Sequence, residues 1–402
     1  MADLELFRKE TRAWLEANCP ASMRWGGETG GNAVINDDLV WGGRKWKSSE
    51  QPDAKLWLDR MAERGWTAPT WPKAYGGGGL SKPEAKILAE EMGKLRCKPP
   101  LIGFGLTMIG PLILEHGTEE QKRTYLPPIC RGEIRWCQGY SEPGAGSDLA
   151  SVQTRAVLDG DEWVLDGQKV WTSYGDKSDW MFALTRTDPD APKHLGISFM
   201  LFDMNTPGVS VRPIKLISGA SPFCETFIEG ARVPKDQVVA GVNNGWAMAK
   251  ALLGHERSMI SEAFSESRDT NQLVELARTH LPWADGRVDD AFTRDRIAQL
   301  TMDKICLDLT IARTKEAMKL GHQPGPESSI FKYYATELNK DRYHLMVSIL
   351  GPQGLGWEGD GFDDLELQTT RAWLRSRGNS IEGGTSEIQL NIIAKRVLGL
   401  PD

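Results

Sequence analysis

The chain has 402 residues and a formal net charge of −7, with an isoelectric point near 5.6. An acidic chain without a long basic run is not expected to bind nucleic acid, and no apolar run approaches the roughly 20 residues of a membrane span. The six cysteines include no Cys-x-x-Cys pair and the six histidines show no metal-ligand spacing. Because the acidic N-terminus does not suit a targeting peptide, we expect a cytoplasmic protein with reduced thiols.

The first third of the chain has helical periodicity. Two helix starts are marked by capping boxes, Ser81 with Glu84 and Thr118 with Gln121. Helices are predicted over residues 3–18, 56–64 and 81–94, and from 118 to Pro127-Pro128. Residues 1–133 are therefore predicted to form an N-terminal helical domain.

From about Ile134 the apolar period changes to two, which is typical of strands. An Asp159-Gly160-Asp161 turn between two such runs predicts a β-hairpin. Candidate strands cover residues 135–141, 152–158, 162–171, 179–187, 196–204, 209–215 and 223–228. We expect a middle β domain, a sheet or barrel, over residues 134–240.

After Pro234 the helical period returns. Helices are predicted over residues 245–280, 290–320, 328–350 and 386–398, with a loop from Gly351 to Gly361. Residues 241–402 form the third predicted domain, so the expected fold class is α+β with three domains.

The most specific motif is the loop Tyr140-Ser-Glu-Pro-Gly-Ala-Gly-Ser-Asp148. Its glycines, Gly144 and Gly146, permit backbone conformations closed to other residues, so the loop can press its amides against a ligand. Taken alone, the motif is equally consistent with an ordinary glycine-rich turn beside a hairpin.

Glu256 is the best candidate for a general base. It continues an apolar helical stripe formed by Ala249, Leu252, Leu253, Ile260 and Ala263. A carboxylate on such a stripe either pairs or has a raised pKa, because burial penalises its charged form. The competing interpretation is a glutamate paired with a basic residue from another element.

A second constellation, Gly383-Gly-Thr-Ser-Glu-Ile-Gln389, leads from a glycine turn into the last predicted helix. Ser386 and Gln389 match a capping box, and helix-start amides behind glycines suit a phosphate. Glu387 would repel a phosphate, so the loop backbone and Thr385 are the better contacts. A capped helix without a ligand is the alternative.

Together these residues resemble the acyl-CoA dehydrogenase family over nearly the whole chain. The similarity rests on four segments in the family's order: Trp71-Pro-Lys-Ala-Tyr-Gly-Gly77, Ser141–Asp148, Asp166-Gly-Gln-Lys-Val-Trp171-Thr-Ser173 and Gly383–Gln389. Leu252-Leu-Gly-x-Glu-Arg257 resembles the large-subunit-like group of pimeloyl-CoA dehydrogenase. The resemblance implies the same three domains, with a C-terminal four-helix domain and FAD held noncovalently between the β domain and the C-terminal helices, partly across a subunit interface.

The resemblance also implies roles for site residues. Positions matching Tyr140, Ser141, Trp171 and Ser173 contact the flavin ring, and Ser147 matches a residue near the acyl-CoA. The cofactor-binding candidates in the last motif are Gly384, Thr385 and Glu387.

The implied reaction removes two hydrogens from a saturated acyl-CoA, a carboxylate taking the α-proton while the β-hydrogen leaves as hydride to the flavin. Many family members place this carboxylate where the chain has Gly383, and Glu382 is one residue too early. A minority, resembling isovaleryl- and long-chain-type members, place it at the position of Glu256, which we therefore predict to be the base, with Glu382 as the alternative. Gly383 keeps a backbone amide for the thioester oxygen and leaves room for a bulky acyl group, and Arg257 matches a CoA contact.

The chain departs from the family where the FAD diphosphate binds. Leu276–Val288 lacks the usual Arg-x-x-Phe-Gly segment, and Ser348 and Pro352 replace a glutamine and a glycine. The expected assembly is therefore a homodimer, a homotetramer or a hetero-oligomer with a related subunit, and the expected electron acceptor is an electron-transfer flavoprotein. The alternatives are a flavin oxidase that uses O2 and a non-catalytic subunit of the same fold.

Overall fold

A computed structural model describes residues 2–25, 39–252, 271–320 and 325–401. The chain divides into two compact units. The first, here called the sheet unit, comprises Met1–Ile214 with Pro222–His255, and the second, the helical unit, comprises Lys215–Ser221 with Glu256–Asp402. None of the helices in the described ranges is both long and apolar enough to cross a bilayer.

The sheet unit begins with helices, as predicted. They are α1 (Ala2–Asn18), α2 (Pro52–Glu63), α3 (Lys82–Lys94), α4 (Gly110–His116) and α5 (Glu119–Cys130). Both predicted capping boxes are present, at Ser81 and Thr118. The predicted stop at Pro127-Pro128 is wrong, because α5 continues to Cys130. Burial of Leu126 and Ile129 favours the last turn over the two amide donors that the prolines lack.

Trp71, the first residue of the first family motif, has a packing role. Its indole is buried against Gly110 at the start of α4, where an added Cβ would lie 2.1 Å from the ring. The carbonyl of Trp71 would similarly lie 2.3 Å from a Cβ on Gly77. These glycines are therefore required by close packing around the tryptophan.

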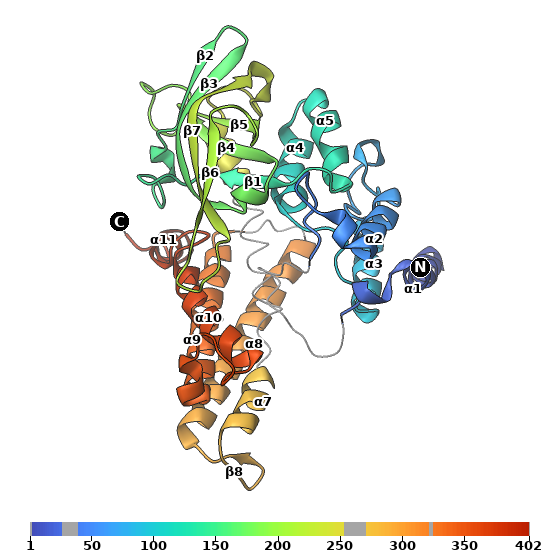
Figure 1. Cartoon of the computed structure of the whole chain (residues 1–402), viewed down its shortest axis with the longest axis vertical. Helices are drawn as coiled ribbons and strands as arrows, with labels where there is room; N and C mark the ends of the chain where they lie inside the picture. Colours follow the sequence, from blue (N-terminus) through green and yellow to red (C-terminus); the bar gives the residue numbers. More distant parts are fainter. Residues whose placement is uncertain (1, 26–38, 253–270, 321–324, 402) are drawn as a thin grey trace. The chain divides into compact units, whose positions relative to one another are not determined.

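Seven strands form one curled sheet in the order β1-β4-β2-β3-β7-β6, with β5 paired to β4 (Figure 1). The strands are β1 (Trp136–Gly139), β2 (Arg155–Asp159), β3 (Glu162–Ser173), β4 (Trp180–Arg186), β5 (Ile197–Asp203), β6 (Val209–Ile214) and β7 (Phe223–Pro234). Each predicted strand has a counterpart. The β2–β3 hairpin turns at Gly160, with φ +64°, as the Asp-Gly signal predicts.

The helices of the sheet unit are fixed to the sheet by aromatic and polar contacts. The Tyr125 ring of α5 packs edge-on against Trp136 and Trp180, at centroid distances of 5.3 and 5.0 Å. The Gln121 side chain donates to the carbonyls of Asp236 and Val238, which follow β7. These contacts hold α5 against β1, β4 and the segment that follows β7.

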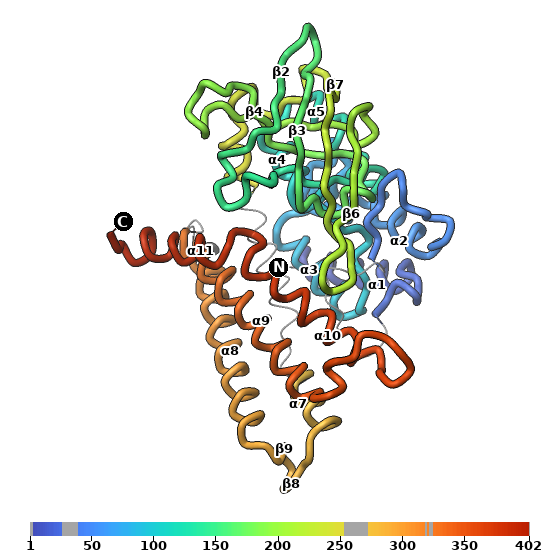
Figure 2. The backbone as a smooth tube through the Cα atoms, turned by 60° about the vertical axis from the view of Figure 1, so that its left-hand side comes forward, coloured from blue at the N-terminus to red at the C-terminus, as the bar shows by residue number. Residues whose placement is uncertain are grey.

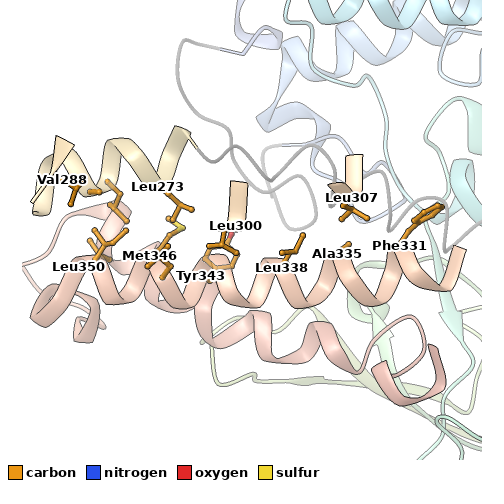
Figure 3. Packing of buried hydrophobic residues seen from close by; sticks show 14 residues of the cluster. Leu273, Val288, Leu300, Leu307, Phe331, Ala335, Leu338, Tyr343, Met346 and Leu350 are labelled. Atoms are coloured by element: carbon orange, nitrogen blue, oxygen red, sulfur yellow. The ribbon is translucent and has the colours of Figure 1, made fainter. Parts of the chain in front are cut away.

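The helical unit contains α7 (Asn271–His280), α8 (Ala291–Lys319), α9 (Ser328–Leu350), α10 (Asp364–Ser376) and α11 (Ser386–Ile392). Its core joins α7, α8 and α9, and Leu273 of α7 lies beside Met346 of α9 (Figure 3). No prediction covered α10, although Asp363 and Glu366 form a capping box at its start. That box is the same signal that identified α3 and α5.

A short hairpin joins α7 to α8 at one end of this bundle (Figure 2). It consists of β8 (Trp283–Ala284) and β9 (Arg287–Val288), with Asp285 and Gly286 between them at φ +52° and +74°. Two successive left-handed residues are typical of a type I′ turn. The hairpin occupies the stretch in which the sequence lacks the Arg-x-x-Phe-Gly segment.

Candidate functional site

The loop that follows β1 is held by a buried ion pair. The carboxylate of Glu142 accepts hydrogen bonds from the Lys169 ammonium at 2.7 Å and from the backbone N–H groups of Gln153 and Thr154 at 2.6 and 2.9 Å. Lys169 is fully buried and also donates to the Leu184 carbonyl at 2.6 Å. Because buried charges are tolerated only when paired and hydrogen-bonded, these contacts fix the loop against β3 and β4.

The same contacts determine the charge of Glu142. Burial alone would raise the pKa of this carboxyl, but the attraction and hydrogen bond of Lys169, with the further donors, hold the pKa below its ordinary value. Glu142 therefore stays ionised at neutral pH. Its role in the motif is to hold the loop in place.

The two motif glycines behave differently from the prediction. Neither Gly144 nor Gly146 has a positive φ, and a Cβ added to either would meet nothing within 4 Å. Neither glycine therefore uses the left-handed conformation that its lack of a side chain permits. The tight turn is made by Glu142 and Ala145, whose backbones exchange two hydrogen bonds of 3.0 Å. Because Gly144 and Gly146 have no side chains, the backbone of the loop is exposed at these two positions.

Trp171 has an unusual backbone and an exposed side chain. Its φ of +61° lies in the left-handed region, at an irregularity in the pairing of β3 with β7 between Lys169 and Thr172. The residue is 54% exposed. A tryptophan in this region costs about 1–2 kcal/mol, and such strain is concentrated at functional sites.

The sheet brings the predicted flavin contacts together. The Val170 amide donates to the Ser141 carbonyl at 2.9 Å, which places the segment after β1 beside the end of β3. Tyr140 is buried, with its ring edge-on to Phe182 and Phe199, so it can offer a ligand only its backbone.

The two predicted serines have free hydroxyls. Among the residues that the structure describes, the Ser141 and Ser173 side chains make no hydrogen bond with one another or with any other group. Ser147 is exposed at the tip of the loop, while its neighbour Asp148 pairs with Lys193 at 2.8 Å. The predicted contact between Ser147 and a substrate stays a prediction.

In the helical unit, the last motif forms a turn between α10 and α11. Gly383 and Gly384 have φ values of +63° and +88°, and a Cβ on Gly384 would lie 2.5 Å from the Gln389 amide nitrogen. The Gln389 side chain donates to the Gly383 carbonyl at 3.1 Å. Within the described ranges, the amides of Gly383 and Gly384 donate to no acceptor, so both are available to a ligand.

The cap of α11 differs from the prediction by one residue. Thr385 is the N-cap, and its hydroxyl accepts from the Ile388 amide at 3.2 Å. The proposed capping box of Ser386 with Gln389 is wrong, because the Ser386 hydroxyl instead donates to Glu337 on α9 at 3.0 Å. Glu387 is exposed in the first helical turn, and the cofactor roles predicted for Gly384, Thr385 and Glu387 stay predictions.

Glu382 is held at both carboxylate oxygens. Oε2 accepts from the Arg375 guanidinium and Oε1 from the Asn379 side-chain amide, each at 2.5 Å. A carboxylate in this state has both of its basic atoms occupied. Glu256 and Arg257 lie outside the described residues. Residues 245–252 are helical, and Ala249 and Leu252 of the predicted apolar stripe are fully buried.

Comparisons with known proteins match this architecture along the whole chain. The acyl-CoA dehydrogenase N-terminal, middle and C-terminal domain families match residues 33–133, 137–231 and 243–398. Acyl-CoA dehydrogenase IpdE1 of Mycobacterium tuberculosis is 36% identical over 403 residues, covering 100% of this chain and 99% of the relative. The chain belongs to the acyl-CoA dehydrogenase family.

Two solved structures extend this similarity. The Tcur3481-Tcur3483 steroid ACAD has a TM-score of 0.76 and 31% identity, over 100% of this chain and 98% of that one. The ChsE4-ChsE5 complex from Mycobacterium tuberculosis has a TM-score of 0.74 and 29% identity, with the same coverage. An acyl-CoA dehydrogenase is an oxidoreductase, and the three-domain architecture predicted from the sequence is confirmed, whereas the boundaries after residues 133 and 240 stay predictions.

Members of the acyl-CoA dehydrogenase family use FAD, and the residues of the sheet unit fit a flavin ring. An isoalloxazine needs a flat apolar surface beside it and polar groups around its edge. The exposed Trp171 indole supplies the surface, and the unengaged Ser141 and Ser173 hydroxyls supply the polar groups.

The helical unit fits the diphosphate end of FAD less well. The Ser348 hydroxyl donates to the His344 carbonyl of its own helix at 2.8 Å, so it does not replace the side chain of the family's glutamine. The β8–β9 hairpin replaces the arginine-bearing segment. At the two described positions where the resemblance implies diphosphate contacts, the structure therefore shows neither the arginine-bearing segment nor a free side chain in place of the glutamine.

The sequence reasoning missed the residues that hold the two loops. Lys169 lies inside one of the family segments, but its partner Glu142 can be identified only when β3 is placed beside the loop. Arg375 belongs to α10, for which no helix was predicted. The Asp363 capping box would have revealed that helix, but the contact of Arg375 with Glu382 depends on how the chain turns after the helix ends at Ser376.

Proposed function

We propose that this protein dehydrogenates an acyl-CoA thioester to the trans-2-enoyl-CoA with FAD and passes the electrons to an electron-transfer flavoprotein. The observation that supports this most directly is in the sheet unit, where Trp171, with its strained backbone and exposed side chain, accompanies the free hydroxyls of Ser141 and Ser173. When bound, FAD supplies the acceptor for the β-hydride.

Glu256 is proposed to remove the α-proton. The other carboxylate considered for this role, Glu382, is engaged by Arg375 and Asn379, and the Glu142 carboxylate is ionised and buried in its ion pair with Lys169. A base must have a free lone pair within reach of the proton it removes. The pairing argues against Glu382 and Glu142 as the base, and this favours Glu256.

Gly383 is proposed to polarise the thioester. Proton loss from the α-carbon places negative charge on the thioester oxygen, and an N–H group aimed at that oxygen stabilises the charge. The Gly383 amide has no acceptor among the described residues. We assign Ser147 and Arg257 to the substrate, as contacts for the acyl-CoA and its CoA portion.

The acyl group is proposed to be bulky. Gly383 has no side chain where many family members carry the catalytic glutamate, which leaves volume beside the thioester. The similarity to a structure described as a steroid ACAD points in the same direction. Acyl groups with fused rings are therefore the first substrates to test, beside straight, branched and ω-carboxylated chains.

The working assembly is proposed to contain a related, non-identical subunit that supplies the missing diphosphate contacts. A similar chain occurs in a ChsE4-ChsE5 complex. On α8, Met302, Ile305 and Leu309 are each more than half exposed and recur at three and four residues, so they share one helix face. An apolar helix face of this kind suits a subunit contact, which a homodimer or homotetramer would equally use.

The test is anaerobic flavin reduction by a panel of acyl-CoA thioesters. The protein, alone and co-expressed with a related subunit, is first assayed for bound FAD, since about one flavin per chain from the protein alone would contradict the hetero-oligomer. Glu256→Gln should retain FAD and lose substrate-dependent bleaching, while Glu275→Gln, an exposed ion-paired glutamate on α7, should bleach normally. Bleaching by Glu256→Gln at the normal rate would refute its role, and rapid reoxidation by O2 would favour the oxidase.

A further inference from the structure

The turn that carries Gly383 is tied to α9 through a chain of polar contacts within the helical unit. The short helix η9 (Arg377–Ser380) precedes this turn. Lys332 of α9 donates to the Asn379 carbonyl at 3.1 Å, and Lys340 of α9 donates to the Ser380 hydroxyl at 2.6 Å. Asn379 in turn holds Glu382, the residue immediately before the glycines.

We propose that Arg375, Asn379 and Glu382 are positioning residues that hold the Gly383 amide where the substrate's thioester oxygen binds. This inference rests on the proposed dehydrogenation. It gives Glu382 a function other than the base and includes Arg375, which no motif contained.

The Glu382 carboxylate is held at both of its oxygens. Arg375 approaches one oxygen from α10 and Asn379 the other from η9, so the side chain cannot rotate without losing a charge-assisted bond. Glu382 N–H also donates to the Gly378 carbonyl at 3.1 Å. With both its backbone and its side chain fixed, Glu382 sets the direction in which the chain enters Gly383.

The glycine pair is also held from its C-terminal side, by Gln389. Gln389 is buried and donates to the carbonyl of Gly383. Holding a carbonyl also fixes the plane of the peptide that follows it, because the peptide bond is planar. The glycine pair, with its two left-handed φ values, is therefore held from Glu382 before it and from Gln389 after it.

Lys332, which donates to the residue that holds Glu382, is buried. This side chain is 1% exposed, and the Asn379 carbonyl is its one hydrogen-bond acceptor in the described ranges. A buried ammonium requires nearby negative charge, and Glu382 and Glu337 both act to raise its pKa against the lowering effect of burial. Burying an ammonium is unfavourable, and apolar packing of this turn does little to offset it, since Ile381 in the turn is 68% exposed. The polar contacts of Lys332 therefore hold the turn.

A preorganised donor matters most at the reacting oxygen. Displacing a group by about 1 Å from its reacting partner can cost on the order of 100-fold in rate. The contacts among Arg375, Asn379 and Glu382 are here called the clamp. Breaking the clamp should slow α-proton loss by about 10- to 100-fold, while substrate binding, which uses many other contacts, changes less.

The experiment uses the FAD-loaded enzyme, with its partner subunit if one is required, and the variants Arg375→Met and Glu382→Gln. A 3-thiaacyl-CoA serves as the probe, because it can lose its α-proton but its sulfur replaces the carbon that donates hydride. Loss of the proton is read from the long-wavelength charge-transfer absorbance as a function of pH. The matched control is Glu275→Gln, which breaks an exposed ion pair on α7 of the same unit.

We expect both clamp variants to raise the apparent pKa of the bound probe by about 1–2 units, which is the same 10- to 100-fold effect, and to lower kcat more than they raise KM. Hydrogen exchange in a peptide covering residues 377–390 should become faster in both variants and remain unchanged in peptides of α8. The control should match the unmodified enzyme in all three measurements.

Three outcomes would overturn the proposal. Complete loss of probe deprotonation in Glu382→Gln, with retention in Glu256→Gln, would make Glu382 the base. Clamp variants that match the control while the unmodified enzyme is active would remove the positioning role and leave the proposed function intact. An unmodified enzyme that binds the probe and never deprotonates it would refute the proposed function itself, and unchanged hydrogen exchange would then also exclude a clamp.

Discussion

Two ion pairs hold two loops of this protein, and they differ in how much solvent reaches them. The side chains of Lys169 and Glu142 are 0% and 7% exposed, whereas those of Arg375 and Glu382 are 17% and 33% exposed. A fully buried pair is strongly destabilising when one partner is removed, because the other charge stays uncompensated. A partly solvated pair can be broken with little effect on folding. The Glu142–Lys169 pair is therefore expected to be needed for folding. The Arg375–Glu382 pair can be broken by mutation to test its role in function without unfolding the protein.

The largest expected effect tests the buried pair directly. Glu142→Gln should lower the free energy of unfolding by about 3–5 kcal/mol, since the Lys169 ammonium is left without its counter-charge. Denaturant unfolding measures the change. Asp148→Asn breaks the exposed pair with Lys193 in the same loop and is the matched control, with an unfolding midpoint that should not move. Equal behaviour of the two variants would show that the Glu142 pair does not hold the loop.

A second buried carboxylate sharpens the comparison through pH. Glu91 on α3 is 0% exposed and contacts Arg8, Arg12 and Lys94. Burial acts to raise its pKa, but these cations together lower it from 4.5 to about 2. A lowered folded-state pKa stabilises the fold above the unfolded value and loses that contribution as pH falls through the folded value. Stability should therefore drop between about pH 5 and 2, by on the order of 2 kcal/mol.

The control for this pH dependence is Glu91→Gln. It should be less stable than the unmodified protein at neutral pH and should lose less stability in acid, as measured by thermal or denaturant unfolding across that range. If the variant loses as much stability in acid as the unmodified protein, carboxylates other than Glu91 are responsible for the pH dependence.

Trp171 provides a smaller, local test in the sheet unit. Trp171→Gly should be more stable than Trp171→Ala by about 1 kcal/mol, because glycine adopts the left-handed conformation without strain. Both variants should bind FAD more weakly than the unmodified protein, since each removes the indole. Equal stability of the two variants would mean that the strain at φ +61° is absent in solution.

The smallest expected effect belongs to the solvated pair. Glu382→Gln should change the free energy of unfolding by about 1 kcal/mol or less, although its effect on α-proton loss is expected to be large. Denaturant unfolding measures the change in stability, and the pH titration of the bound probe measures the change in α-proton loss. A destabilisation as large as that of Glu142→Gln would erase the distinction between the two pairs.

The sequence predicted the architecture well because periodicity and turn chemistry are local properties. The strands from β1 to β7, the capped helices α3 and α5 and the Asp-Gly hairpin are all decided by neighbours a few residues apart. The prolines of α5 show the limit of that reasoning, because burial of the last turn outweighs a strong local stop signal.

The sequence identified the residues of the candidate site better than it predicted their backbone conformations and side-chain contacts. The motifs led to Ser141, Trp171 and Gly383, but the left-handed backbone of Trp171 depends on how β3 pairs with β7. The pairing of Glu142 with Lys169, and of Glu382 with Arg375, joins groups whose proximity follows from tertiary packing. These contacts decide which carboxylates are occupied, and the sequence alone left Glu382 open as a base.

The β8–β9 hairpin has a practical consequence for studying assembly. Its Asp285-Gly286 turn is exposed and connects two short strands at one end of the helix bundle (Figure 2). Exposed turns with small polar residues tolerate inserted sequence well, so an affinity tag placed between these two residues should leave the core of α7, α8 and α9 intact. Co-expressing tagged and untagged copies with a related subunit would then reveal, from the composition of the captured particles, how many copies of this chain each one contains.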